Sequence, residues 1–367
     1  MSALSTCAPG KTRALGEDFL VLRTRRRILQ QSYVGGIYTG RATRGQDAVG
    51  TRHTLGLDAR LATRSFWGNK NLDGSAFYLR ATNANGQGQS QAYGGFVFYP
   101  NDIWEAGSGF TTVEPGFDPA VGFTPRRGFR QYNPFVFYMR RPVTRHPTVR
   151  RYGWGVGTDL FTDMNSRWVT REINVRVGRI EFHTGDNIEA NVVPSYERLQ
   201  QPFRISSGIT LPAGRSYSFT RYSVSVNTAN QRVVALRPRV EWGGFLSGTR
   251  RELGFDVGIR PRPGVTLNLA NEWNQVSLAE GRFSTRLHRA IVDTQFSPFV
   301  SLVNNVQYDS VSRVLGWQSR LRWTVTPGND VFVVYTHNWI EDSLEPNQRF
   351  RTLDRRGAAK AVYTKRF

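Results

Sequence analysis

The sequence predicts an all-β protein, an antiparallel transmembrane β-barrel of about 16–18 strands, of which the first N-terminal strands are expected to be missing. Three observations predict this fold. Apolar and polar residues alternate with period two in many segments, and clusters of Gly, Pro and Asn separate these segments. The segments are also roughly 9–13 residues long, whereas soluble strands usually have ~5–6. The composition agrees, because the chain has 36 Gly and 13% aromatic residues.

The alternation recurs along the chain. Clear examples are TLGLDARLA (54–62), REINVRVG (171–178), VALRPRVEW (234–242), VTLNLANEW (265–273) and GWQSRLRWTV (316–325). Successive side chains of a strand point to opposite faces, so each segment has one apolar and one polar face. In the last segment, Trp317, Leu321 and Trp323 share one face, and Arg320 and Arg322 share the other.

Two environments fit such faces: core and bulk water in a soluble sandwich, or lipid and a wet lumen in a membrane barrel. The strand length favours the barrel, in which a one-residue shift would aim Arg320 and Arg322 at lipid, at about 2–4 kcal/mol each at the midplane. The expected lumen-facing residues are Arg176, Arg237, Arg239, Asn268, Glu272, Arg320 and Arg322. The expected membrane-interface or lipid-facing residues are Trp242, Trp273, Trp317, Trp323, Tyr363 and Phe367.

Connections of two kinds fit the same topology. Tight Pro-Gly turns occur at 261–264 and 326–329, and longer connections at 114–131, 199–216 and 340–356. Outer-membrane barrels have short turns at the periplasmic rim and long loops outside. Counting hairpins back from the last strand places 340–356 outside and both tight turns inside. The final strand, with Tyr363 and the terminal Phe367, is similar to the signal that assembly machinery reads in such proteins.

Composition argues against a nucleic-acid-binding groove, a disulfide framework and membrane-spanning helices. The formal net charge is +21, and only four of the 49 basic residues are lysine. The arginines are spread over the chain, which favours a solvated face over a groove for nucleic acid. Cys7 is the single cysteine, so no disulfide framework is expected, and no apolar run approaches the ~18 residues of a membrane helix. We expect residues 1–16 to be a linker or tail and 17–367 to be the barrel, in a chain that is part of a longer precursor because no signal segment is visible.

Motifs for chemistry are lacking. The sequence has no G-x-S-x-G, Walker or H-E-x-x-H pattern, and its five histidines are scattered. Carboxylates are numerous, but the sequence singles out no pair for glycosidic chemistry. We therefore expect no metal, no cofactor and no catalytic residue, and the sequence favours a protein that is not an enzyme.

Several stretches carry a resemblance to a known family. They are VLRTRRRILQQSYVGGIYTGR (21–41), GFDPAVGFTPRRGFRQY (116–132), YERLQQPFRISSGITLPAGRSYSFTRY (196–222), GRFSTRLHRAIVDTQFSPFVSLVNNVQYD (281–309) and LRWTVTPGNDVFVVY (321–335). The chain resembles the C-terminal barrel of an uncharacterised Gram-negative outer-membrane family whose members usually carry an N-terminal, family-nine-like carbohydrate-binding domain. The resemblance covers nearly the whole chain and implies an outer-membrane location and a link to glycans. It brings no catalytic residues, and that N-terminal domain is not visible in this sequence.

Four functions remain open at this stage. The first is a channel-like barrel whose arginines favour anionic or polyhydroxylated solutes, unless those arginines only brace the wall by pairing with carboxylates. The second is a surface anchor, in which loops 114–131 and 340–356 contact a glycan ligand. The alternatives are a subunit of a cell-surface carbohydrate-active hydrolase and a soluble basic β protein that binds nucleic acid. The expected partners are outer-membrane lipid, the assembly machinery and a glycan, with no nucleic acid.

Overall fold

The computed structural model describes residues 16–44, 50–82, 90–144, 146–341 and 350–364. Within these ranges it has 22 β-strands and no helix. The strands are β1 (Gly16–Arg27), β2 (Tyr33–Arg44), β3 (Arg52–Phe66), β4 (Lys70–Thr82), β5 (Ser90–Pro100), β6 (Trp104–Val113), β7 (Phe129–Tyr132), β8 (Phe135–Arg140), β9 (Val149–Asp163), β10 (Trp168–Phe182), β11 (Asn187–Arg198), β12 (Phe203–Ser206), β13 (Ile209–Leu211), β14 (Ser216–Asn227), β15 (Val234–Phe245), β16 (Gly248–Arg262), β17 (Val265–Leu278), β18 (Gly281–Ser297), β19 (Val300–Asp309), β20 (Val314–Thr326), β21 (Asn329–Glu341) and β22 (Phe350–Val362).

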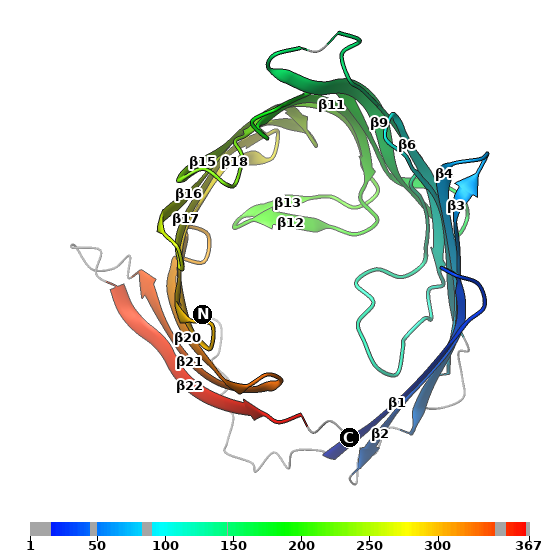
Figure 1. The fold of residues 1–367 in the computed structure, drawn as a ribbon, viewed down its shortest axis with the longest axis horizontal. Coiled ribbons are helices and arrows are strands. Elements are labelled where there is room, and N and C mark those ends of the chain that lie inside the picture. The colour runs from blue at the N-terminus through cyan, green and yellow to red at the C-terminus, as the bar shows by residue number, and fades with distance from the viewer. Residues whose placement is uncertain (1–15, 45–49, 83–89, 145, 342–349, 365–367) are drawn as a thin grey trace. The chain divides into compact units, whose positions relative to one another are not determined.

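The strands pair antiparallel with neighbours in the chain, and Figure 1 follows this order from blue to red. Eighteen of the described strands have 10 to 17 residues, at the upper end of the number expected from the sequence. The other four are short. Strands β7 and β8 follow each other closely and both pair with β6, and β12 and β13 form a separate two-stranded sheet. The described segments contain no helix long and apolar enough to cross a membrane.

The chain divides into two compact units. The first consists of Met1–Val136 and Thr158–Thr170, and the second of Phe137–Gly157 and Arg171–Phe367. The predicted boundary between a tail (1–16) and a barrel (17–367) falls next to residues 1–15, which lie outside the described ranges, so it stays a prediction.

In the first unit, the connection after β6 folds back over one face of the sheet. Phe117 packs with Ala81, Ala92 and Val113 from three neighbouring strands, in one of the two described buried clusters. The backbone amide of Ala120 donates to the hydroxyl of Thr54 at 2.8 Å. Part of the long connection predicted at 114–131 is therefore a folded lining of the sheet, and its last residues belong to β7.

In the second unit, the sheet register sorts side chains into two faces. Directly opposed residues of paired strands point to the same side. Across β15–β18 the row Arg237, Asp256, Ala270 and Arg289 is aligned on one side. We call this side the arginine face. The opposite side carries rows such as Leu236, Val257, Leu269, Ala290, Val306 and Trp317, and we call it the apolar face.

The turns of the second unit also fall into two sets, because antiparallel strands alternate in direction. One edge, the short-turn edge, has the connections 183–186, 228–233, 263–264, 298–299 and 327–328. The other, the long-loop edge, has 199–215, 246–247, 279–280 and 310–313. The two Pro-Gly turns predicted to share a rim do so, and Gly264 (φ +79°) and Gly328 (φ +95°) supply the left-handed backbone that each needs. The connection predicted at 340–356 is shorter, since β22 begins at residue 350, and 342–349 lie outside the described ranges.

Candidate functional site on the arginine face

The predicted lumen residues gather on the arginine face of the second unit. The register aligns Arg239 with Glu272 across Gly254, and Arg237 with Ala270 across Asp256. The same face holds the remaining predicted residues, Arg176, Asn268, Arg320 and Arg322. The sequence pattern thus predicted one common face, and its role as the lining of a lumen stays a prediction.

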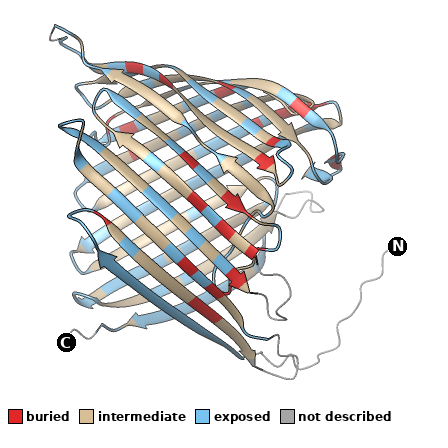
Figure 2. Ribbon diagram, turned by 90° about the vertical axis from the view of Figure 1, so that its right-hand side faces the viewer, coloured by how far each residue is buried: buried red, intermediate tan, exposed pale blue. Residues whose placement is uncertain are grey.

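Four of the six predicted interface residues lie on the apolar face. Trp242, Trp273, Trp317 and Trp323 share it by register. Tyr363 follows the end of β22 and is exposed, and Phe367 lies outside the described residues. Many large apolar side chains on this face are uncovered, among them Leu253 (46% exposed) and Val333 (46% exposed). No second layer of described chain covers them, and buried residues are sparse on the ribbon in Figure 2.

Ion pairs brace part of the arginine face. The carboxylate of Glu241 accepts from Arg221 at 3.0 Å and from Arg239 at 2.6 Å, and Arg221 also reaches Glu172 at 3.3 Å. Glu241 is buried, and the two guanidinium groups compensate its charge. This chain of alternating charges links β10, β14 and β15.

Other predicted arginines are paired in the same way. Arg322 donates to Asp330 at 3.0 Å. Arg176 lies 3.2 Å from Glu189, and its guanidinium carbon lies 4.1 Å from the centre of the Phe137 ring. The expected pairing with carboxylates is therefore present at Arg176, Arg239 and Arg322, and their role in a lumen wall stays a prediction.

Three arginines of this face have no carboxylate partner among the described residues. Among the described residues, Arg289 and Arg320 make no ion pair or side-chain hydrogen bond, and both are exposed. Arg237 donates only to the amide oxygen of Asn230. These cations keep their charge available to a solute, whereas a paired guanidinium has its charge largely compensated.

A shallow pocket of about 380 Å³ opens between β15 and β18 on this face. The pocket is open above Gly254 and Ala270, because these residues have little or no side chain to fill it. Its rim carries Arg237, Arg239 and Arg289 together with Glu252, Asp256 and Glu272. Asn268 lies one row further along β17 and is not part of the lining. Such a mixed rim can donate hydrogen bonds from guanidinium groups and accept them with carboxylates.

The β12–β13 hairpin, which the sequence pattern did not reveal, covers the long-loop end of the arginine face. Ile209 and Leu211 pack with Tyr217, Val276 and Leu278, and Leu211 is fully buried. Figure 1 shows the hairpin, in green, standing off the strands that carry it. A signal was present in the sequence, since Ser207-Gly208 separates two short alternating apolar runs, and Gly208 has φ +77°.

No group of three or more His, Cys, Asp or Glu within the described ranges is arranged to hold a metal ion. Some carboxylates of the arginine face are held by neighbouring side chains: Glu252 accepts from Arg250, and Glu272 accepts from Asn274. The arrangement offers both hydrogen-bond donors and acceptors to a polar solute.

Comparison with solved structures shows the fold. The ferric-catecholate import receptor Fiu from E. coli, in its open form, superimposes with a TM-score of 0.55 at 8% sequence identity, over 94% of this chain and 72% of that one. The predicted fold class, an all-β antiparallel β-barrel, is therefore confirmed. A mutant of the ferric enterobactin receptor from Pseudomonas aeruginosa, in complex with enterobactin, is also similar, at 8% identity and the same coverages, with a TM-score of 0.31. No family model and no curated protein matches the sequence.

Proposed function

We propose that this chain is the barrel of an outer-membrane uptake or channel protein, with the arginine face lining the lumen and the apolar face toward lipid. The observation that carries this proposal is the uncovered apolar face of the second unit. In water, contiguous apolar surface of this extent is rare on a soluble chain. Hydrocarbon is the solvent that favours it, and spanning strands then satisfy their backbone groups through the sheet.

The solute class follows from the lining. Arg237, Arg289 and Arg320 are cations without a carboxylate partner, so the lumen would raise the local concentration of anions. The pocket between β15 and β18 also offers carboxylates, which accept from hydroxyl groups. An anionic, polyhydroxylated solute such as an acidic sugar matches both properties.

The resemblance to a family whose members carry a carbohydrate-binding domain supports a glycan as this solute or as a neighbouring ligand. Under the same proposal, the β12–β13 hairpin narrows the lumen near its outer mouth, because it packs across β14, β15 and β17 at the long-loop edge.

Planar-bilayer recording tests the proposal. The purified protein in a salt gradient is expected to give a reversal potential that shows anion preference. The variant Arg289→Gln/Arg320→Gln is expected to lose most of this preference, since both cations are exposed on the arginine face. The matched control is Arg286→Gln, which lies opposite Trp273 on the apolar face and should keep the wild-type preference. Absence of current, or cation preference in the wild-type protein, contradicts the proposal.

A further inference from the structure

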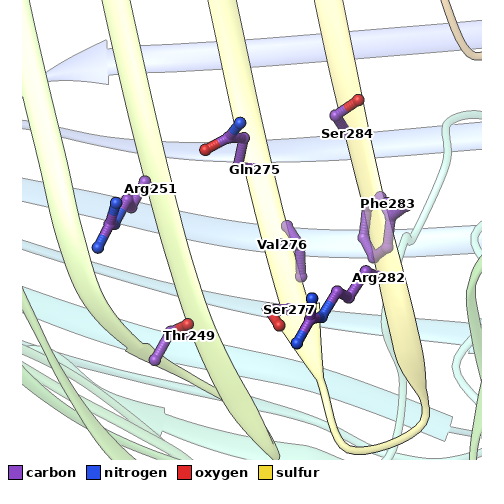
Figure 3. A pocket seen from close by; sticks show the side chains of 8 residues that line it. All are labelled: Thr249, Arg251, Gln275, Val276, Ser277, Arg282, Phe283 and Ser284. Atoms are coloured by element: carbon purple, nitrogen blue, oxygen red, sulfur yellow. The ribbon is translucent and has the colours of Figure 1, made fainter.

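A second hollow lies on the opposite side of the same strands, near the long-loop edge. It has a volume of about 530 Å³ and lies between β16, β17 and β18. The residues on its apolar-face side are Thr249, Arg251, Gln275, Ser277, Arg282 and Ser284 (Figure 3). All six are polar, whereas Trp242, Leu253 and Trp273 in the adjoining positions of the same face are apolar.

Register fixes these side chains on the apolar face. Gln275 is opposed by Arg251 on one side and by Ser284 on the other. Arg282 opposes Ser277 next to the 279–280 turn. Arg251 also opposes Trp242, which identifies the row as one of the apolar face. The lumen-facing role of the arginine face therefore does not account for these two arginines.

Both arginines are uncompensated. Within the described ranges, neither Arg251 nor Arg282 makes an ion pair or a side-chain hydrogen bond, and no carboxylate lines the hollow. Their neighbours supply hydroxyl and amide donors. Two guanidinium groups with hydroxyl and amide donors around them form a set that recognises phosphate, because phosphate accepts several charge-assisted hydrogen bonds at once.

The order of residues along β16 adds a second requirement on the ligand. Arg251, Leu253, Phe255 and Val257 follow one another on the same face, from the turn towards the middle of the strand. Leu253 and Phe255 are both exposed, at 46% and 40%. A ligand seated here would therefore place an anionic head at the arginines and apolar chains along the strand below them.

Aromatic side chains mark the boundary between these two zones. Trp242 opposes Arg251 and stacks on Tyr222, with ring centroids 6.0 Å apart and an interplanar angle of 25°. Trp and Tyr are enriched where hydrocarbon meets headgroups. Arg251 lies level with this boundary and Arg282 lies on its turn side, so both are at the level of lipid headgroups under the proposed orientation.

We infer that this hollow is a binding site for the phosphate-bearing headgroup of a membrane lipid, with Arg251 and Arg282 as its cationic ligands. The inference rests on the proposed membrane location, and the long-loop edge then places the lipid in the outer leaflet. The bound lipid would fill the hollow with its headgroup and cover Leu253 and Phe255 with its chains.

Native mass spectrometry of the detergent-solubilised full chain tests this inference, with phosphatidic acid and phosphatidylcholine offered at equal concentration. The wild-type protein should retain phosphatidic acid in preference. Arg251→Gln/Arg282→Gln should bind it at least about tenfold more weakly, while Arg251→Lys/Arg282→Lys keeps the charge and retains part of the binding. The matched control, Arg289→Gln/Arg320→Gln, removes the same charge from the arginine face and should bind like the wild type.

Three results would overturn the inference. The first is unchanged retention of phosphatidic acid by Arg251→Gln/Arg282→Gln. The second is an equal loss in the control variant, which would indicate attraction by net charge alone. The third is complete displacement by millimolar inorganic phosphate, which would indicate a site for a free anion. If instead the proposed membrane location is wrong, the chain should be monodisperse in buffer without detergent, a result distinct from these three.

Discussion

Placing a charge in the middle of the apolar face tests which solvent that face meets. Leu321 lies in β20, opposite Leu302 and Val333, and is 37% exposed. If hydrocarbon surrounds it, Leu321→Arg places a guanidinium near the bilayer midplane, and we expect a loss of about 2–4 kcal/mol in the free energy of unfolding. If water surrounds it, a surface substitution of this kind should change stability by only about 0.5 kcal/mol.

The assay is reversible urea unfolding from phosphatidylcholine vesicles, followed by tryptophan fluorescence. Gln318→Arg is the matched control, because Gln318 lies three residues away in the same strand but on the arginine face, opposite Asn305 and Thr336. It should change stability by less than about 0.5 kcal/mol. A loss below that value for Leu321→Arg, or equal losses for both variants, would refute the assignment of the two faces.

Three further predictions concern the arginine face and its edges. Glu241→Gln leaves Arg239 without a carboxylate partner and leaves Arg221 with Glu172 alone. We expect a loss of about 2 kcal/mol in the free energy of unfolding in urea, less than for a fully buried pair because Arg239 is half exposed, and an unchanged midpoint would contradict the bracing role. Leu211→Asp should detach the β12–β13 hairpin from its buried cluster and raise single-channel conductance, and an unchanged or lower conductance would argue against a constriction there. Hydrogen bonds from Arg232, then from Thr184 and the backbone amide of residue 229, lower the pKa of Asp186 to about 2. The stabilisation that ionised Asp186 contributes is therefore fully present above its unfolded pKa of 3.8 and is lost as the pH falls towards 2. Asp186→Asn should remove this part of the loss of stability in acid, which unfolding curves at pH 5 and pH 2 would show.

The sequence was sufficient to predict the two faces, for a physical reason. The alternation of side chains is a property of each single strand, so Arg320 and Trp323 can be assigned to opposite faces before any partner strand is identified. The tight turns were predictable as well, because Gly264 and Gly328 meet a local backbone requirement. These local rules account for the agreement on fold class and on the shared face of the predicted lumen residues.

The parts that depend on register were not predictable. Whether an arginine braces the wall or stays available depends on which carboxylate the neighbouring strands bring opposite it. Arg176 meets Glu189 and Arg322 meets Asp330, whereas Arg320 meets Val303 and Val334. The sequence pattern alone treated these arginines as equivalent.

The folded connections were missed for a different reason. Long Gly- and Pro-containing segments between strands read as loops, and the apolar residues in them are too few to show a period. Phe117 in the first unit and Leu211 in the second are buried by contacts with residues distant in sequence. A short alternating run with a Ser-Gly centre, as at 207–208, is the signal to look for in such segments.

The measurement that tests the central claim most directly is the accessibility of spin labels along β20 in lipid vesicles. Single cysteines at positions 317 to 325, with Cys7 replaced by serine, would each carry a nitroxide. Odd-numbered positions should collide most often with oxygen, which concentrates in hydrocarbon, and even-numbered positions with a water-soluble nickel chelate. High nickel accessibility at the odd-numbered positions, or no alternation at all, would show that hydrocarbon does not cover the apolar face.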